Sequence, residues 1–101
     1  MSRFSIDDLA RCREKIDDLD LRLLRLLNQR TAIVEEIGRV KQDLRMAIYE
    51  PKREDQVFAN VTSQNHGPLP NEAVKRIFER IIDEMRNVQK LKMLERDGPR
   101  Q

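Results

Sequence analysis

The sequence has few of the residues that interrupt helices or build sheets. Its 101 residues include 3 glycines, 4 prolines, no tryptophan and only 4% aromatic residues. A β-sandwich or β-barrel needs many turns and many aromatic residues, so this composition favours a helical protein with long solvated faces. The single cysteine, Cys12, excludes an internal disulfide framework and is typical of a reducing compartment such as the cytoplasm.

Charge and hydropathy exclude further classes of protein. The 20 Lys and Arg residues nearly balance the 18 Asp and Glu residues, for a net charge of +2, so we expect no nucleic-acid binding by bulk charge. No apolar run approaches the roughly 18 residues of a membrane span. The charged N-terminus lacks the apolar core of a signal peptide. We therefore expect residues 1–101 to form one cytoplasmic domain.

A long amphipathic helix is predicted over residues 6–44. Ser5 is a suitable N-cap, and Asp8, three residues later, completes a capping box. Beyond this start, one helical stripe recurs at alternating steps of three and four residues, as in a coiled coil. We call this stripe the seam; its members are Leu9, Cys12, Ile16, Leu19, Leu23, Leu26, Arg30, Ile33, Ile37, Val40 and Leu44.

The length of this helix predicts an intertwined homodimer. About 39 residues at 1.5 Å per residue span roughly 58 Å. A compact domain of about 100 residues has a radius of gyration of only about 13 Å. The rest of one chain cannot cover such a helix, so we expect much of the seam to meet a second subunit.

Two more helices are predicted. Pro51 suits the first position of a short helix over about 51–65, and the segment 65–68 is a turn. Apolar spacing predicts a third helix over about 71–96, followed by a loose C-terminal tail. The expected fold is all-α, with a long, a short and a long helix in each chain.

Arg30 breaks the apolar pattern, because it occupies a seam position. A buried guanidinium costs on the order of several kcal/mol unless it is paired. Arg30 therefore either reaches solvent, pairs with a carboxylate such as Glu36, or forms an anion site. Lys41 shares its helical face, about 16 Å away, so the two cations can converge on one small anion; alone, Lys41 is typical of a surface lysine.

Arg13 lies too far along the helix to join that site within one chain. It is about 42 Å from Lys41 if the helix is straight. Arg13 can serve the same site only from an antiparallel partner; otherwise it forms an exposed pair with Asp17. No spacing typical of a metal site, a phosphate loop or a nucleophilic dyad is present in the sequence.

Four segments together resemble the all-helical chorismate mutases of the AroQ type. They are LARCREKIDDLDLRLLRLLNQR, IGRVK, YEPKRE and RIFERIIDEMRNVQ, within residues 6–94. The intervals from Arg13 to Arg30, Lys41 and Arg53 match those of the family. The resemblance implies an intertwined dimer with two equivalent sites, each completed by one arginine of the other chain, in agreement with the arguments from length and reach.

The implied reaction is the rearrangement of chorismate to prephenate in phenylalanine and tyrosine biosynthesis. It is a unimolecular pericyclic step and requires no cofactor, metal or nucleophile. The resemblance therefore implies catalysis by positioning and electrostatic stabilisation. By matched position, Arg13 of the partner subunit, Arg30 and Arg53 would grip the substrate carboxylates. Lys41 and Gln89 would donate hydrogen bonds to the ether oxygen, which gains negative charge as its bond to the ring breaks.

Glu50 and Glu54 would accept the ring hydroxyl. The chain departs from the family pattern at two positions. Glu50 stands where some members have aspartate, which is a shorter acceptor of the same kind. Met85 stands where some members have a small hydroxyl residue near a substrate carboxylate, and a thioether cannot donate that hydrogen bond.

Two other functions remain open. Relatives with this fold eliminate pyruvate from isochorismate in a similar cationic pocket. A helical dimer without catalytic activity, which docks on a separate enzyme of the aromatic pathway, is the second alternative. The charged seam position at Arg30 favours a site over a plain dimerisation module.

Overall fold

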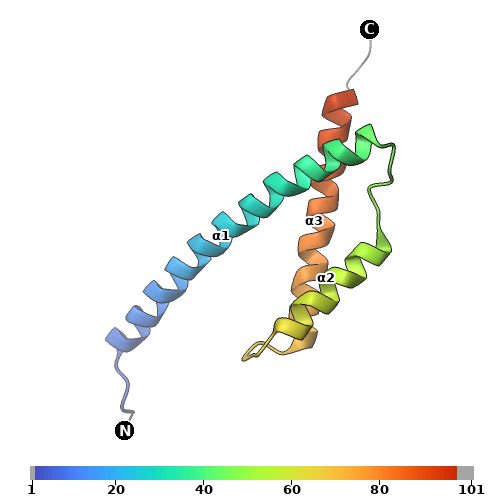
Figure 1. Ribbon diagram of the computed structural model, residues 1–101. Helices are drawn as coiled ribbons and strands as arrows, with labels where there is room; N and C mark the ends of the chain where they lie inside the picture. The colour runs from blue at the N-terminus through green and yellow to red at the C-terminus, as the bar shows by residue number, and fades with distance from the viewer. Residues whose placement is uncertain (1, 98–101) are drawn as a thin grey trace. The chain divides into compact units, whose positions relative to one another are not determined.

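The computed structural model describes residues 2–97 and is all-α over this range (Figure 1). Its helices are α1 (Ile6–Asp43), α2 (Pro51–Gln64) and α3 (Asn71–Asp97). These bounds agree with the predicted ones to within one residue, which is as close as helix ends are defined. The predicted loose tail lies outside the described residues. Among the described helices none is long and apolar enough to cross a membrane.

The start of α1 is the predicted capping box. The backbone amide of Ser5 donates to Asp8 Oδ2 at 2.8 Å, and the backbone amide of Asp8 donates to Ser5 Oγ at 3.3 Å. These reciprocal bonds satisfy amides that have no partner within the helix. The bond from the Ser5 amide lowers the pKa of the Asp8 carboxyl below its ordinary value.

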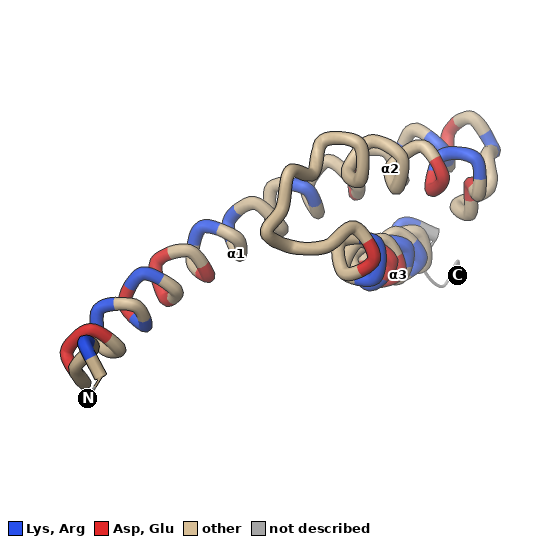
Figure 2. The backbone as a smooth tube through the Cα atoms, turned by 90° about the horizontal axis from the view of Figure 1, so that it is seen from below, with Lys and Arg blue, Asp and Glu red and all other residues tan. Residues whose placement is uncertain are grey.

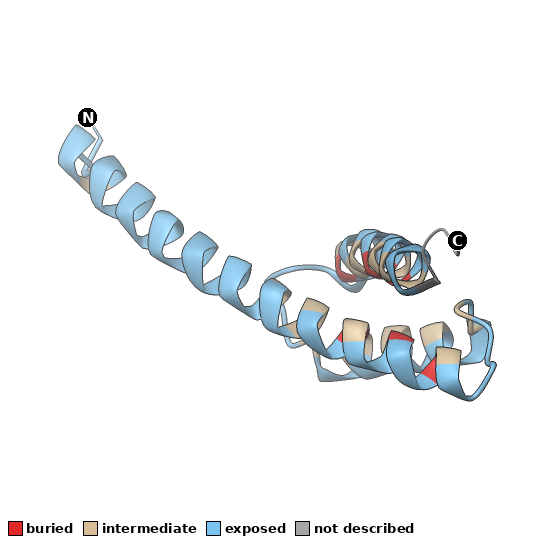
Figure 3. Ribbon diagram, turned by 90° about the horizontal axis from the view of Figure 1, so that it is seen from above, coloured by how far each residue is buried: buried red, intermediate tan, exposed pale blue. Residues whose placement is uncertain are grey.

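The chain divides into two compact units within α1. The N-terminal unit ends at Ala32 and the C-terminal unit begins at Ile33. In the N-terminal unit the helix carries Lys, Arg, Asp and Glu interspersed along its length (Figure 2). The apolar seam residues there are between 48% and 60% exposed: Leu9, Ile16, Leu19, Leu23 and Leu26. Cys12 is exposed as well, and Arg30 is a half-buried member of the seam in this unit. Exposed residues prevail along this part of α1 (Figure 3).

The C-terminal unit contains the end of α1 together with α2 and α3. Its buried apolar side chains are Val34, Val74, Ile82 and Met85. Two polar side chains are buried as well, Lys41 on α1 and Gln89 on α3. The buried positions thus lie on the last turns of α1 and along α3 (Figure 3). A small apolar core that also encloses a lysine and a glutamine points to a function for those two residues.

Candidate active site

The end of α1 directs the chain back toward Lys41. The Met46 amide donates to the Lys41 carbonyl at 2.8 Å, and the Arg45 amide donates to the Gln42 carbonyl at 3.2 Å. Together with a φ of 56° at Arg45, this pattern is a Schellman motif, which usually has glycine at the left-handed position. The reversed chain then runs past the Lys41 side chain on its way to α2.

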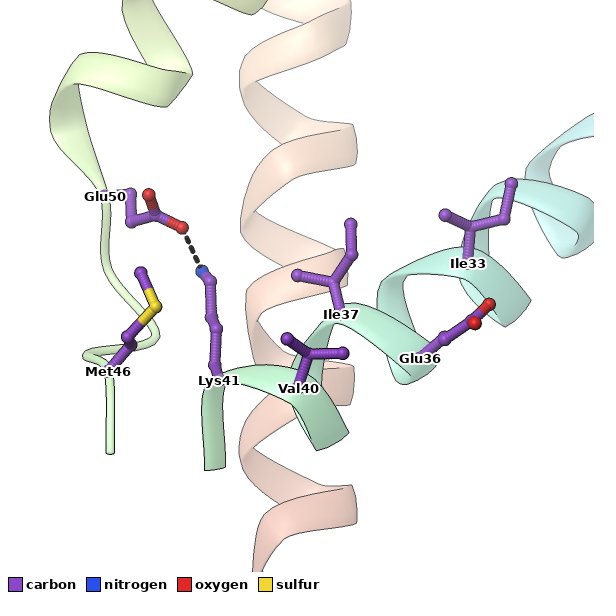
Figure 4. Close-up of a pocket in the computed structure, with 7 residues that line it drawn as sticks. All are labelled: Ile33, Glu36, Ile37, Val40, Lys41, Met46 and Glu50. Carbon is purple, nitrogen blue, oxygen red and sulfur yellow. Dashed lines mark ion pairs between the residues drawn. The ribbon is translucent and has the colours of Figure 1, made fainter. Parts of the chain in front are cut away.

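Lys41 is held by two oxygens of that returning segment. Its Nζ donates to the Ile48 carbonyl at 2.8 Å and lies 2.6 Å from Glu50 Oε1 (Figure 4). Lys41 is 7% exposed, so its charge is compensated inside the fold by Glu50 and by the carbonyl dipole. An ammonium group has three N–H donors, and these two bonds leave capacity for one more acceptor.

A pocket of about 360 Å³ opens beside this ion pair. Its lining comes from the end of α1 and from the segment before α2, namely Ile33, Glu36, Ile37, Val40, Lys41, Met46 and Glu50 (Figure 4). Three of these residues, Ile33, Ile37 and Val40, continue the apolar seam. The pocket therefore combines an apolar wall with a paired cation and carboxylate, the usual composition of a small-molecule site.

Gln89 extends from α3 toward α1. It is 8% exposed, and its Nε2 donates to the Val34 carbonyl at 3.3 Å. Gly38, one turn after Val34, faces the same side chain: a methyl group added there would lie 3.5 Å from Gln89 Cγ. One N–H of the amide is thus used to fix the side chain, and an amide carries a second. Position beside the apolar stripe alone indicates a boundary residue, but the structure buries Gln89.

Glu54 is paired with a residue that the sequence did not single out. Arg86 on α3 places Nη2 2.6 Å from Glu54 Oε2, and its guanidinium carbon lies 5.0 Å from the centre of the Tyr49 ring. The one signal available in the sequence was a charged residue beside the apolar stripe of the third helix. That signal is weak, because such residues are usually solvated.

The remaining predicted residues do not line the pocket. Arg53 is exposed on α2 and donates from Nη1 to Gln56 Oε1 at 3.3 Å. Met85 is buried in the core of the C-terminal unit. Arg13 and Arg30 belong to the N-terminal unit, where Arg13 is exposed and Arg30 is half-buried. The structure thus joins Lys41 to Glu50 and aims Gln89 at α1, while only Lys41 and Glu50 of the predicted set line the pocket.

Comparison with known proteins identifies the family of this arrangement. The family model described as chorismate mutase type II matches residues 12–90, which include the seam from Cys12 onward, the Lys41 segment and Gln89. The chain belongs to the type II chorismate mutase family. The resemblance in the four sequence segments is thereby confirmed, as is the all-helical fold that it implied.

Individual members of this family show how similar the chain is to known proteins in sequence and in structure. A bifunctional chorismate mutase/prephenate dehydratase of Neisseria gonorrhoeae is 40% identical over 72 residues, which cover 71% of this chain and 19% of the relative. Chorismate mutase of Thermus thermophilus, form II, has a TM-score of 0.81 at 32% identity, over 82% of this chain and 94% of that one. Chorismate mutase of Helicobacter pylori in complex with prephenate has a TM-score of 0.82 at 28% identity, over 88% and 97%.

The matched fraction of the relative's own length differs between the bifunctional relatives and the solved chorismate mutases. The chain spans about a fifth to a quarter of the length of the first bifunctional relatives it matches. It spans nearly all of the two solved chorismate mutases. The matched region is therefore the chorismate mutase part of the longer proteins' sequences.

Proposed function

We propose that this chain is a chorismate mutase, which rearranges chorismate to prephenate in phenylalanine and tyrosine biosynthesis. The observation that carries the proposal is the buried Lys41 ammonium, paired with Glu50 at a pocket, in a chain of the chorismate mutase family. Chorismate is a dianion with an ether oxygen and a ring hydroxyl, so it offers acceptors for cations and a donor for carboxylates.

The reaction needs only positioning and electrostatics. The ether C–O bond breaks while a C–C bond forms within the same molecule, and no proton or electron enters or leaves. Negative charge grows on the ether oxygen in the transition state. The remaining donor of Lys41 and the second N–H of Gln89 would bind that oxygen, and their attraction increases as the charge develops. Burial strengthens both interactions because little water screens them.

Arginines would hold the substrate carboxylates in the reactive conformation. We assign this role to Arg30, Arg53 and Arg13 of the partner subunit, because a guanidinium pairs with a carboxylate through two parallel bonds and keeps its charge. Half-burial of Arg30 at a seam position supports the assignment. The geometry of a helix of 38 residues, roughly 57 Å, supports the contribution of Arg13 from a second chain.

The proposal includes an intertwined homodimer. The exposed apolar side chains of the N-terminal unit support it, since a contiguous exposed apolar stripe usually marks an interface. A second, antiparallel copy of α1 would cover the seam and complete two equivalent sites. Lys41 and Arg13 of the partner subunit would then approach the same substrate.

Glu50 and Glu54 would accept the ring hydroxyl. Glu50 has one oxygen on Lys41 and Glu54 has one on Arg86, so each carboxylate is already oriented by a cation. For Met85, the thioether allows only an apolar contact with the substrate. Its burial in the core supports a contact through shape and not through a hydrogen bond.

The proposal places the single domain in the cytoplasm, without a cofactor. An enzyme that consumes prephenate is the expected kind of separate partner. The bifunctional name of the Neisseria gonorrhoeae relative supports this choice, because one chain there joins the mutase to a dehydratase.

Direct assay tests the function. Purified protein is mixed with chorismate, without added metal or cofactor, and the loss of chorismate absorbance is followed while the product is identified by chromatography. Formation of prephenate is the expected result. A folded dimer that leaves chorismate intact would contradict the proposal, and conversion of isochorismate to salicylate and pyruvate would replace it by the lyase activity.

A further inference from the structure

Arg86 connects three parts of the C-terminal unit. Its Nη2 lies 2.6 Å from Glu54 Oε2 on α2 and 3.6 Å from Asp83 Oδ1 on its own helix. Its guanidinium carbon lies 5.0 Å from the centre of the Tyr49 ring, in the segment that precedes α2. Arg86 thus ties α3 to the start of α2 and to the neighbour of Glu50.

The pair formed with Glu54 differs from the ordinary surface pairs of α3. The Arg86 and Glu54 side chains are 26% and 22% exposed, whereas those of the Arg80–Glu84 pair on the same helix are 77% and 53% exposed. A pair that is largely withdrawn from water is screened less and holds its geometry better than an exposed pair. Tyr49 adds a cation–π contact on one face of the guanidinium.

The pairing with Arg86 compensates the negative charge of Glu54. Chorismate carries two negative charges, so an uncompensated carboxylate at the site would repel it. Glu50 is compensated by Lys41 at 2.6 Å, and Glu54 is compensated by Arg86 at the same distance. Each proposed hydroxyl acceptor therefore has its own cation, held by a different helix. The two pairs can accept a hydroxyl without opposing the binding of a dianion.

We propose that Arg86 is a positioning residue for the mutase reaction. It holds Glu54 through Oε2 and compensates its charge, so that Oε1 can accept the ring hydroxyl of chorismate. The inference rests on the proposed function and adds to it a residue that does not itself contact the substrate. In this role Arg86 supports, through Glu54, the binding of the substrate hydroxyl and not the binding of either substrate carboxylate.

The test compares two substrates and four variants. The variants are Arg86→Gln, Arg86→Lys, Glu54→Gln and the double variant Arg86→Gln/Glu54→Gln, with Arg80→Gln as the matched control on an exposed pair of α3. The substrates are chorismate and its analogue with hydrogen in place of the ring hydroxyl. Values of kcat and KM and the melting temperature are measured for each protein.

For chorismate, Arg86→Gln should lower kcat/KM by about 10- to 100-fold, as expected for the loss of a hydrogen bond to a charged group. For the analogue, which is also a dianion, the same variant should lose clearly less, since only the repulsion by the uncompensated Glu54 remains and no hydroxyl needs this carboxylate. The double variant should be no worse than Glu54→Gln alone. Arg86→Lys should recover much of the loss because it retains the charge. Arg80→Gln should act on both substrates like wild type.

Three results would overturn the positioning role. Equal losses on both substrates would mean that Arg86 acts on another group or only supports the fold. Additive losses in the double variant would separate Arg86 from Glu54. A wild-type rate in folded Arg86→Gln would remove the role while leaving the mutase function intact. Failure of the wild-type protein to convert chorismate would instead overturn the proposed function, and the positioning role with it.

Discussion

The two units of the chain differ in which side chains they bury. The N-terminal unit leaves a stripe of leucine and isoleucine exposed, whereas the C-terminal unit buries Lys41 and Gln89 beside its apolar core. Exposed apolar stripes usually mark surfaces that another molecule covers. Buried polar residues persist where their hydrogen bonds are satisfied and their chemistry is used. The first unit therefore carries the features of an interface, and the second carries those of a site.

The exposed stripe and Lys41 lie on one helix, α1, whereas Gln89 lies on α3. The seam begins in the N-terminal unit, and three of its later members, Ile33, Ile37 and Val40, form a wall of the pocket. A second copy that covers the seam would thus also approach the pocket. In the proposed dimer, one α-helix would thus provide an interface at one end and a cation for catalysis at the other.

The largest effect is expected at Lys41. Lys41→Met removes the buried ammonium that is proposed to bind the ether oxygen and leaves Glu50 unpaired. Loss of one preorganised donor to a developing charge typically costs about 10²- to 10³-fold in kcat. Turnover of chorismate should fall at least that far in protein that remains helical by circular dichroism. Lys52→Met, at an exposed position on α2, is the matched control and should retain wild-type turnover.

An activity of folded Lys41→Met within tenfold of wild type would remove Lys41 from the site. The control separates loss of this cation from a general reduction in positive charge. A similar drop in both variants would point to electrostatic attraction of the dianion by the whole surface and not to one donor.

Gln89→Glu should make the reaction depend on pH. A glutamate has an ordinary pKa of about 4.3, so at neutral pH the new side chain is a carboxylate. It cannot donate to the ether oxygen, and it faces the Val34 carbonyl that Gln89 now binds. Turnover at pH 7 should fall by about 100-fold and rise again as the pH is lowered toward the carboxyl pKa, where the protonated acid can donate. Rates measured from pH 4 to 8 should show no such rise in wild type.

The shared site predicts complementation between two inactive chains. Arg13→Ala and Lys41→Ala should each be nearly inactive, because every site in either homodimer lacks one cation. After the two are unfolded and refolded together in equal amounts, half of the dimers are mixed, and each mixed dimer has one intact site. About a quarter of the wild-type rate should return, since wild type has two sites per dimer. Refolded mixtures that stay inactive, with dimers present by sedimentation, would contradict a site shared between chains.

The sequence predicted the helices because their ends carry local signals. Ser5 and Asp8 define the start of α1, and Pro51 defines that of α2. Periodic apolar residues then fix the type of element between these ends. The end of α1 carries no such signal, because Arg45 occupies a left-handed position that usually has glycine. The return of the chain to Lys41 is therefore a property of the folded structure.

The contacts between side chains of the site were harder to predict from the sequence than the helices. Lys41 and Glu50 are nine residues apart; Lys41 was singled out because it shares a helical face with Arg30, and Glu50 through the family resemblance, but their contact was not predicted. Arg86 and Glu54 are separated by 32 residues, and their contact depends on how α2 and α3 pack. The apolar pattern alone indicates a boundary residue at Gln89, because a polar residue beside an apolar stripe usually faces water; its role as a donor was implied by the resemblance. Its burial shows that the pattern of one helix does not reveal which of its edges a neighbouring helix covers.

The smallest effect is expected at the exposed start of α1, far in sequence from the pocket. The Asp8 carboxylate accepts the Ser5 amide, and this bond lowers the pKa of Asp8 below its ordinary value of 3.8. A lowered pKa means that the carboxylate stabilises the folded helix above pH 3.8 and that this contribution is lost as the pH falls through the lower value. The Ser5 amide signal in nuclear magnetic resonance spectra should therefore titrate with a midpoint below 3.8. In Asp8→Asn the titration should disappear, and chorismate turnover at neutral pH should stay at the wild-type rate, since Asp8 caps α1 and is not among the residues proposed for the site.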